Sequence, residues 1–304
     1  MRELCAKIRF GGPLTVAQYM REALTNPGSG YYMKKDVFGR QGDFVTSPEV
    51  SQMFGECLGI WIINEWLKMG RPAPLQLVEL GPGRGTLMAD ILRTFGKISP
   101  DALAGMSVHL VEVSDAMRRL QEAALCGDAP SQQPARDVSG DSNAFHQRRS
   151  SAGPLVSWYS SSRDVPRGFS FFVAHEFFDA LPVHKFVRGG GGDGDEKWHE
   201  ILVDVDGDGL RFVRAKGKTP AVSLIDAGEE KDEVEVCPTA GVLVKSLCER
   251  IATDGGALLV ADYGHGGEKG DTLRAFKGHA LADPLKEPGD ADLTADVDFS
   301  YLKR

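Results

Sequence analysis

Short runs of apolar residues alternate with longer amphipathic segments through most of the chain. The apolar runs predict strands near 75–80, 107–113, 155–159, 169–174 and 257–262. The amphipathic segments predict helices near 86–96 and 114–125. Strands that are apolar along their whole length are usually buried on both faces, as in a parallel sheet covered by helices. The pattern therefore predicts an α/β fold with a Rossmann-like, doubly wound parallel sheet.

The residues before the first predicted strand have a helical pattern. Thr15 can cap a helix that ends before Pro27. A second long helix is expected to begin near Ser47 or Pro48 and to bury the apolar stretch 53–67. These two helices would form a lid beside the α/β sheet.

We expect two domains, a helical N-terminal lid region over 1–70 and the α/β domain over 71–304. Within the second domain, 127–153 is rich in Ser, Gln, Pro and Gly, which predicts a mobile loop. Apolar and polar residues alternate between 184 and 237, around a glycine-rich tip at 189–195. The alternation predicts antiparallel hairpins inserted between the fourth and fifth parallel strands.

The composition excludes several classes of function. The chain has 304 residues and a formal net charge of −8, so it lacks the basic excess that neutralises the phosphates of a nucleic acid. The most apolar stretch, 53–67, is interrupted by polar residues, so we predict no membrane span. The five cysteines are scattered without C-x-x-C spacing, which favours reduced thiols over disulfides or a zinc site.

The most informative motif is 77–87, where an apolar run is followed by Gly81, Gly83 and Gly85 and then by a helical pattern. A strand, a tight turn and a helix start bring bare backbone and unpaired N–H groups against a nucleotide-like ligand. An ordinary βα turn would share this pattern. The identity of a ligand therefore depends on the residues around the turn.

Two carboxylates flank the glycine turn. Glu112 ends the next predicted strand, where a carboxylate can accept both hydroxyls of a ribose. It lies farther along the chain than the roughly 20-residue spacing of dinucleotide sites, and the glycines are not spaced as G-x-G-x-x-G. Glu79 stands before the turn and can face a cation. This arrangement favours S-adenosylmethionine, which has an ammonium and a sulfonium but no pyrophosphate.

Two short motifs partly match metal sites. The run 204–209 opens like a calcium loop, but Ala215 stands where the closing carboxylate is needed. His175 and Glu176 begin a zinc-protease signature, but Asp179 replaces the second histidine. We predict a hairpin turn at the first motif and no metal at either.

Several longer motifs in a fixed order closely resemble the MidA-type methyltransferase family. The animal member of this family is a mitochondrial protein arginine methyltransferase that serves respiratory complex I assembly. The resemblance covers nearly the whole chain and is carried by 12–20, 30–32, 42–49, 79–85, 175–182, 261–265 and 292–299.

The resemblance implies a class I S-adenosylmethionine-dependent methyltransferase domain. It implies that the cofactor is held by Glu79, Gly81, Gly83, Gly85 and Glu112. It also implies that the N-terminal region covers the cofactor with Gly42, Asp43, Phe44, Thr46 and Ser47. The implied substrate is an arginine in a core subunit of the complex I peripheral arm, symmetrically dimethylated in the mitochondrial matrix.

Such a reaction requires carboxylates at the acceptor. A guanidinium is protonated at physiological pH, so its nitrogen is a poor nucleophile, and bidentate carboxylates can hold it in line with a methyl donor. Glu176 and Asp179 follow the fourth predicted strand, where α/β sheets place their chemistry, and Glu49 is a third candidate from the lid region. Alternatively, Asp179 caps a helix that begins near Ala180. His175 or His265 could relay the released proton, or be a loop or core residue.

In the family, the stretch that ends at Phe299 continues into a further segment, whereas this chain stops at Arg304. Class I methyltransferases add a final antiparallel hairpin beyond the fifth strand, so we expect that hairpin to be missing and one sheet edge to be unfilled. Two other functions stay open: an assembly chaperone with little turnover on the same fold, and a nicotinamide-dependent dehydrogenase.

Overall fold

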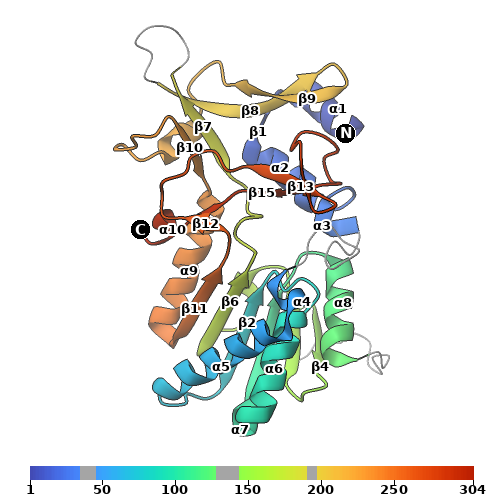
Figure 1. The fold of residues 1–304 in the computed structure, drawn as a ribbon, viewed down its shortest axis with the longest axis vertical. Coiled ribbons are helices and arrows are strands. Elements are labelled where there is room, and N and C mark those ends of the chain that lie inside the picture. Colours follow the sequence, from blue (N-terminus) through green and yellow to red (C-terminus); the bar gives the residue numbers. More distant parts are fainter. Residues whose placement is uncertain (35–45, 128–143, 190–196) are drawn as a thin grey trace. The chain divides into compact units, whose positions relative to one another are not determined.

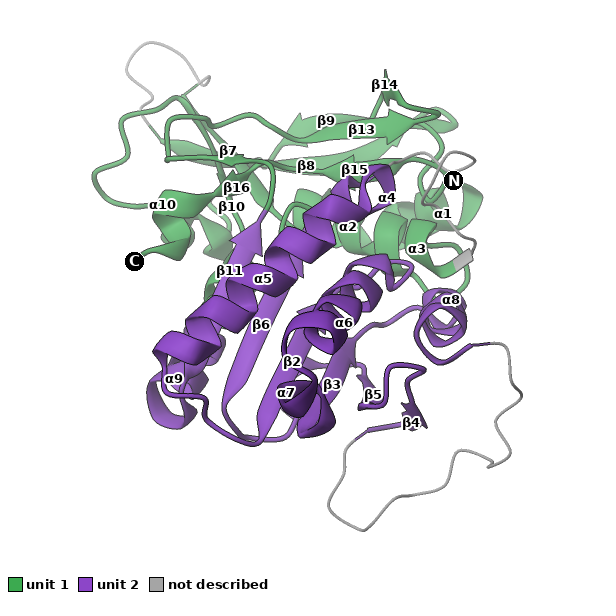
Figure 2. Ribbon diagram, turned by 60° about the horizontal axis from the view of Figure 1, so that its bottom comes forward, with its two compact units in different colours: residues 1–34, 178–244, 262–304 green, residues 35–177, 245–261 purple. Residues whose placement is uncertain are grey.

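The computed structural model describes residues 1–34, 46–127, 144–189 and 197–304 (Figure 1). The chain packs into two compact units, coloured separately in Figure 2. The first unit combines Met1–Lys34, Phe178–Val244 and Asp262–Arg304, and the second combines Lys35–Phe177 and Lys245–Ala261. The predicted division into 1–70 and 71–304 stays a prediction, because these units follow packing and are each built from several segments.

The second unit is built on the predicted parallel sheet. Its strands pair in the order β11-β6-β2-β3-β5-β4, and the first five are parallel to their neighbours. They are β2 (Leu75–Leu80), β3 (Met106–Val111), β5 (Leu155–Tyr159), β6 (Ser170–His175) and β11 (Gly256–Ala261). The predicted α/β fold and its five parallel strands are confirmed. Of the strands described, β11 is the outermost on its side of this sheet.

The order of the strands reverses between β2 and β6. The chain passes from β2 outward through β3 and β5, then returns to place β6 on the other side of β2. Leu80 at the end of β2 lies opposite Ala174 near the end of β6. The carboxyl ends of two strands that diverge in this way form the crevice where α/β sheets bind ligands.

One strand of this sheet was not predicted. Residues 146–149 form β4 (His146–Arg149), which pairs antiparallel with β5. These residues fall in the expected loop 127–153, whose central part, 128–143, lies outside the described residues. The segment carries no large apolar residue that would signal a strand, and an edge strand needs only its backbone pairing.

The helices of the second unit are α4 (Ser47–Val50), α5 (Gln52–Lys68), α6 (Thr86–Ile98), α7 (Pro100–Ala104) and α8 (Asp115–Cys126). Helix α9 (Pro238–Asp254), whose residues from Lys245 onward belong to this unit, leads into β11. The predicted second long helix is divided at Ser51, whose extended backbone (φ −151°, ψ 123°) separates α4 from α5. Within the described ranges, no helix is long and apolar enough to cross a membrane.

The apolar helix α5 is buried on one side only. Gly55 and Gly59 are buried, whereas Met53 and Ile60 are 68% and 50% exposed, so the predicted burial of the 53–67 helix holds on one side only. The two glycines let α5 lie directly against α6, and the two helices run side by side across the sheet (Figure 2). Beneath them, large side chains such as Phe95, Trp158 and Phe171 fill the core.

This close helix packing gives a testable prediction. A Cβ added at Gly55 would lie 2.5 Å from the Cβ of Asp90, whereas a Cβ at Gly96 would meet only the Leu103 side chain at 3.6 Å. We expect Gly55→Ala to lower the free energy of unfolding by about 1–3 kcal/mol through overpacking. We expect the matched control Gly96→Ala to raise it by about 0.5 kcal/mol, because it only reduces the freedom of the unfolded chain. Urea denaturation measures both, and equal effects would contradict the packing argument.

The first unit contains the predicted antiparallel hairpins. Its five-stranded sheet consists of β1 (Leu14–Thr15), β7 (His184–Arg188), β8 (Trp198–Asp206), β9 (Gly209–Arg214) and β10 (Glu233–Val236). A second sheet consists of β13 (Arg274–Lys277), β14 (Ala280–Ala282) and β15 (Asp292–Thr294), and β12 (Gly264–His265) pairs with β16 (Val297–Asp298). The pairing of β1 with β8 was not predicted, because two residues are too few for a strand pattern.

The helices of the first unit are α1 (Arg2–Gly11), α2 (Val16–Thr25), α3 (Tyr31–Lys34) and α10 (Phe299–Leu302). The predicted cap of α2 is confirmed: the Thr15 hydroxyl accepts a hydrogen bond from the backbone N–H of Gln18 at 3.1 Å. Gln18 returns the interaction by accepting from the backbone N–H of Thr15 at 2.9 Å. This reciprocal capping box fixes where the helix begins.

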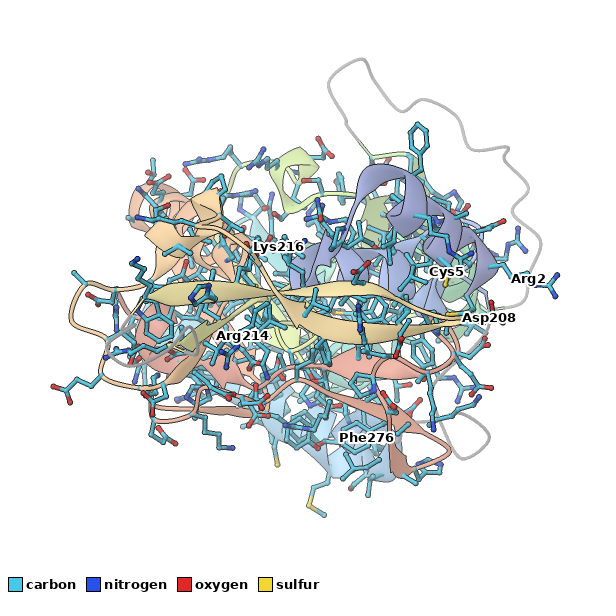
Figure 3. The ribbon with its side chains drawn as sticks, turned by 90° about the horizontal axis from the view of Figure 1, so that it is seen from above. Arg2, Cys5, Asp208, Arg214, Lys216 and Phe276 are labelled. Carbon is cyan, nitrogen blue, oxygen red and sulfur yellow. The ribbon has the colours of Figure 1, made fainter. Side chains whose placement is uncertain are left out.

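The predicted hairpin turn at 204–209 is also confirmed. Asp206 pairs with Gly209 across the turn, and Gly207 has a φ of 59°, the left-handed conformation that a tight β-hairpin turn requires. Figure 3 shows this ribbon from above, with Asp208 at its turn and Arg214 on β9. Across the described parts of the chain, no group of three or more His, Cys, Asp or Glu side chains is placed to hold a metal ion.

Candidate functional site

The glycine turn lies at the carboxyl end of β2, where the strand order reverses. Gly81, Gly83 and Gly85 have φ angles of 62°, 51° and 83°, all in the left-handed region that favours glycine. Gly85 is the residue before α6, and its N–H donates to the carbonyl of Pro82 at 2.8 Å. The turn therefore passes from β2 into the N-terminus of α6 in a few residues.

Two of these glycines are required by the packing of the protein itself. A Cβ on Gly81 would lie 2.6 Å from the Phe177 ring, and a Cβ on Gly85 would lie 3.2 Å from the Cα of Gln121. The sequence prediction assigned the missing side chains to a ligand. The structure gives a second reason for glycine at these positions. Without side chains, Gly81 and Gly85 allow the segment after β6 and helix α8 to pack against the turn.

Glu79 is a buried acid with an unused oxygen. Glu79 belongs to β2 and is 3% exposed. Its Oε2 has no hydrogen-bond partner among the described residues. Burial raises the pKa of the Glu79 carboxyl from 4.5 to about 8. A buried carboxyl without a partner destabilises a fold unless it meets a cation or a donor, so the position is prepared for a positively charged group.

Glu112 directly follows β3 and its carboxylate is held from two sides. Its Oε1 accepts from the backbone N–H of Ser114 at 2.8 Å, and its Oε2 accepts from the side-chain amide of Gln121 at 3.1 Å. Burial raises the pKa of the Glu112 carboxyl, and these hydrogen bonds oppose the rise. A carboxylate has about four acceptor positions, so each oxygen retains capacity for a ligand hydroxyl.

Gln121 was not singled out in the sequence. It lies on α8 and is fully buried, and its amide also donates to the carbonyl of Gly83 at 2.7 Å. Its carbonyl accepts from the indole N–H of Trp158 at 3.0 Å. The available signal was its spacing, because Gln121 occupies the buried stripe of α8 between Met117 and Leu125.

The N-terminal residues of the site are only partly described. Gly42, Asp43 and Phe44 lie outside the described residues. Thr46 and Ser47 stand at the start of α4. Their expected role over a cofactor therefore stays a prediction.

Glu49 on α4 reaches the glycine turn. Its Oε1 lies 3.7 Å from the guanidinium of Arg84, and its Oε2 accepts a long 3.4 Å hydrogen bond from the N–H of Thr46. The Oε1 atom is buried and accepts no hydrogen bond from the described residues. Glu49 thus has a local structural function, and its oxygen already faces one guanidinium.

Glu176 directly follows β6 and has an unusual backbone. Its φ is 46°, which is uncommon for a residue with a side chain, and its N–H donates to the carbonyl of Ala261 at 2.9 Å. Its Oε1 lies 3.5 Å from His175 Nε2. Burial lowers the pKa of His175 to about 4, so this imidazole is neutral near pH 7. Through the neighbouring Phe177, this segment touches the glycine turn.

Asp179 belongs to the first unit, where it joins two other motifs of the family resemblance. The hydroxyl of Thr294 donates to Asp179 at 2.7 Å, and the hydroxyl of Tyr32 donates to Asp292 of the same strand at 2.7 Å. Burial raises the pKa of the Asp179 carboxyl. The alternative that Asp179 caps a helix from Ala180 is wrong, because the chain makes a turn there.

His265 behaves as a loop residue. Its Nδ1 accepts hydrogen bonds from the backbone N–H groups of Gly267 at 3.0 Å and Lys269 at 3.4 Å. An imidazole nitrogen that holds a loop in this way is engaged with the backbone. The structure therefore favours the structural interpretation of this histidine over the proton relay.

The arrangement in the second unit fits a ligand with two chemically different ends. Glu112 offers acceptors to hydroxyl groups, and Glu79 offers a buried carboxyl to a positive charge. The glycine turn lies beside both, because Gly81 follows Glu79 by two residues and Gly83 shares Gln121 with Glu112. Glu176 directly follows the adjacent strand β6, and its expected role in binding a cationic acceptor stays a prediction.

Comparison with known proteins agrees with this geometry. Residues 57–304 match the family model described as "Putative S-adenosyl-L-methionine-dependent methyltransferase". The chain is 51% identical over its whole length to the mitochondrial protein arginine methyltransferase NDUFAF7 of Mus musculus and covers 69% of that protein. It is 52% identical to the NDUFAF7 protein of Homo sapiens, of which it covers 68%.

A solved structure has the same fold. The crystal structure of a protein from Burkholderia thailandensis, bound to S-adenosyl-homocysteine, superposes with a TM-score of 0.76 at 25% sequence identity. The match covers 99% of this chain and 73% of that protein. The ligand in that structure has ribose hydroxyls at one end and an amino-acid ammonium at the other.

Proposed function

This chain belongs to the family of S-adenosyl-L-methionine-dependent methyltransferases, and we propose that it methylates arginine in a protein. The substrate in this proposal is an arginine in a core subunit of the complex I peripheral arm, converted to symmetric dimethylarginine during assembly of complex I in mitochondria. The proposal draws on the names of the relatives and on the family resemblance of the motifs. The observation that carries the cofactor in this proposal is the Oε2 of Glu79, which is buried beside the glycine turn and has no hydrogen-bond partner among the described residues.

The residues of the second unit fit the cofactor. Glu112 would accept from the ribose hydroxyls, and Glu79 would balance the positive charge of the amino-acid end. Gly81, Gly83 and Gly85 would leave the backbone of the turn open to the ligand, and Thr46 and Ser47 would lie on its N-terminal side. When bound, S-adenosylmethionine supplies an electrophilic methyl group on a sulfonium.

The acceptor guanidinium would be held by carboxylates. Glu176 is the first candidate, because it stands at the strand end next to the glycine turn and its neighbour His175 adds no positive charge near pH 7. A carboxylate that accepts two N–H groups holds the guanidinium plane and leaves the third nitrogen to face the donor. Asp179 and Glu49 are the further candidates for this clamp and stay proposals.

The decisive experiment follows a labelled methyl group. Purified protein is incubated with S-adenosylmethionine labelled on the methyl carbon and with a purified core subunit of the peripheral arm. We expect label in symmetric dimethylarginine after acid hydrolysis of that subunit. Label in lysine or in a small molecule would contradict the arginine substrate.

The same assay separates the remaining alternatives. Stable binding of the subunit without transferred label would support an assembly chaperone on a methyltransferase fold. A change in nicotinamide absorbance would be needed for a dehydrogenase. In this chain, the acid after the glycine turn is Glu112, and Gln121 connects it to the turn by hydrogen bonds to both.

A further inference from the structure

The buried amide of Gln121 can adopt only one orientation. The indole of Trp158 is a donor only, so the atom that faces it at 3.0 Å must be the Gln121 carbonyl oxygen. The Gly83 carbonyl at 2.7 Å and the Glu112 carboxylate at 3.1 Å are acceptors only, so they must face the amide NH₂. Both amide hydrogens and the carbonyl are therefore used, and no other orientation satisfies all three partners.

This geometry makes Gln121 the link between two parts of the cofactor site. One amide hydrogen fixes the backbone of the glycine turn and the other fixes the Oε2 of Glu112. The Oε1 of Glu112 is fixed separately by the backbone N–H of Ser114 at 2.8 Å. The orientation of the Glu112 carboxylate is therefore fixed by one hydrogen bond to each oxygen. Gln121 helps to determine the directions in which the remaining lone pairs can accept from a ligand.

We propose that Gln121 is a positioning residue for ribose recognition, which orients the Glu112 carboxylate so that the protein selects ligands carrying ribose hydroxyls. The proposal rests on the proposed function, because it assumes an adenosine-bearing cofactor. Gln121 has no direct contact with the ligand in this proposal. It acts through the Glu112 carboxylate, and its hydrogen bond to the Gly83 carbonyl holds the amide in place for that contact.

The test compares two ligands by calorimetry, S-adenosylhomocysteine and its 2′,3′-dideoxy analogue. A hydrogen bond to a charged group contributes enough for the wild-type protein to prefer the parent ligand about 10- to 100-fold. In Gln121→Met, which has similar size but no amide, we expect the parent ligand to bind about tenfold more weakly. The dideoxy analogue should bind almost as before, so the preference between the ligands collapses.

The choice of ligands separates positioning from simple structural damage. A loss of structure weakens both ligands together, and unchanged preference in Gln121→Met would overturn the proposal. Gln147→Met is the matched control, because Gln147 is in the same unit and donates to Ser157 at 2.9 Å without touching Glu112. If Gln121→Met melts below the assay temperature, Gln121→Asn replaces it in the same test. Asn keeps the amide, but its side chain is too short to reach both Gly83 and Glu112.

A double-mutant cycle tests whether the effect passes through Glu112. In a Glu112→Gln background, Gln121→Met should no longer change the preference for the parent ligand, since the carboxylate that it positions is absent. Additive effects would overturn the proposal. Failure of wild-type protein to bind S-adenosylhomocysteine at all is a different result, and it would contradict the proposed cofactor rather than the role of Gln121 alone.

Discussion

Glu176→Gln is expected to lower the rate of methyl transfer by about 100-fold or more while the affinity for S-adenosylhomocysteine stays unchanged. Gln has nearly the same shape as Glu but carries no charge, so it cannot hold a guanidinium in bidentate fashion. Misalignment of the acceptor nitrogen then slows the reaction without affecting the cofactor. The measurements are single-turnover transfer of labelled methyl groups and calorimetry on the same sample.

Two comparisons sharpen this prediction. Glu65→Gln removes a half-buried carboxylate of the same unit, which accepts from Lys68 at 2.8 Å and from Asn64 at 3.2 Å on α5, and should leave transfer unchanged. Glu176→Asp keeps the charge on a shorter side chain and should retain more activity than Glu176→Gln. Wild-type turnover in Glu176→Gln would exclude Glu176 as the clamp and leave Asp179 and Glu49 as the candidates.

The affinity for the cofactor is expected to rise about tenfold for each pH unit as the pH increases toward 8. Burial raises the pKa of Glu79 to about 8, so this side chain is mostly protonated in the free protein at pH 6. A cationic ligand group prefers the ionised carboxylate, and binding below pH 8 must therefore release a proton. Between pH 6 and pH 8 the affinity should rise about 50-fold, because half of the carboxyl is ionised at pH 8, and above pH 8 it should level off.

The same carboxyl affects the free protein with the opposite sign. The folded form holds its proton up to about pH 8, whereas the unfolded form loses it near pH 4.5. The contribution of Glu79 to stability is therefore lost as the pH rises through this range. Stabilisation by the cofactor should be largest at the alkaline end.

Glu79→Gln is the control, because its amide does not titrate. The pH dependence of cofactor affinity should become shallower in this variant, because the titration of Glu79 is removed. A slope as steep as that of the wild type would show that Glu79 does not face the cation. Calorimetry in two buffers of different ionisation enthalpy would count the released protons directly.

The sequence predicted the sheet well because its signals are local. The five parallel strands are apolar runs bounded by turn residues. Thr15 caps α2 through a hydrogen bond with Gln18, only three residues along the chain. Their parallel arrangement follows from the helices between them. Such elements are largely decided by the residues that form them.

The parts that were missed depend on contacts between distant residues. His146–Arg149 became a strand because β5 offered it an edge, and Ser51 divides the predicted long helix although the residues around it suit a helix. Gln121 meets Gly83, Glu112 and Trp158 from three other elements. Nothing in the spacing of these residues along the chain reveals that they converge.

The left-handed backbone of Glu176 has a consequence for the history of the fold. A residue with a Cβ in this conformation costs about 1–3 kcal/mol, and Gly or Asn would occupy it more cheaply. A relative that served only as a chaperone would be free to relax here. Under the proposed clamp, methyl transfer would account for the retention of Glu at this place, and we expect Gly or Asn there in relatives that have exchanged catalysis for stability.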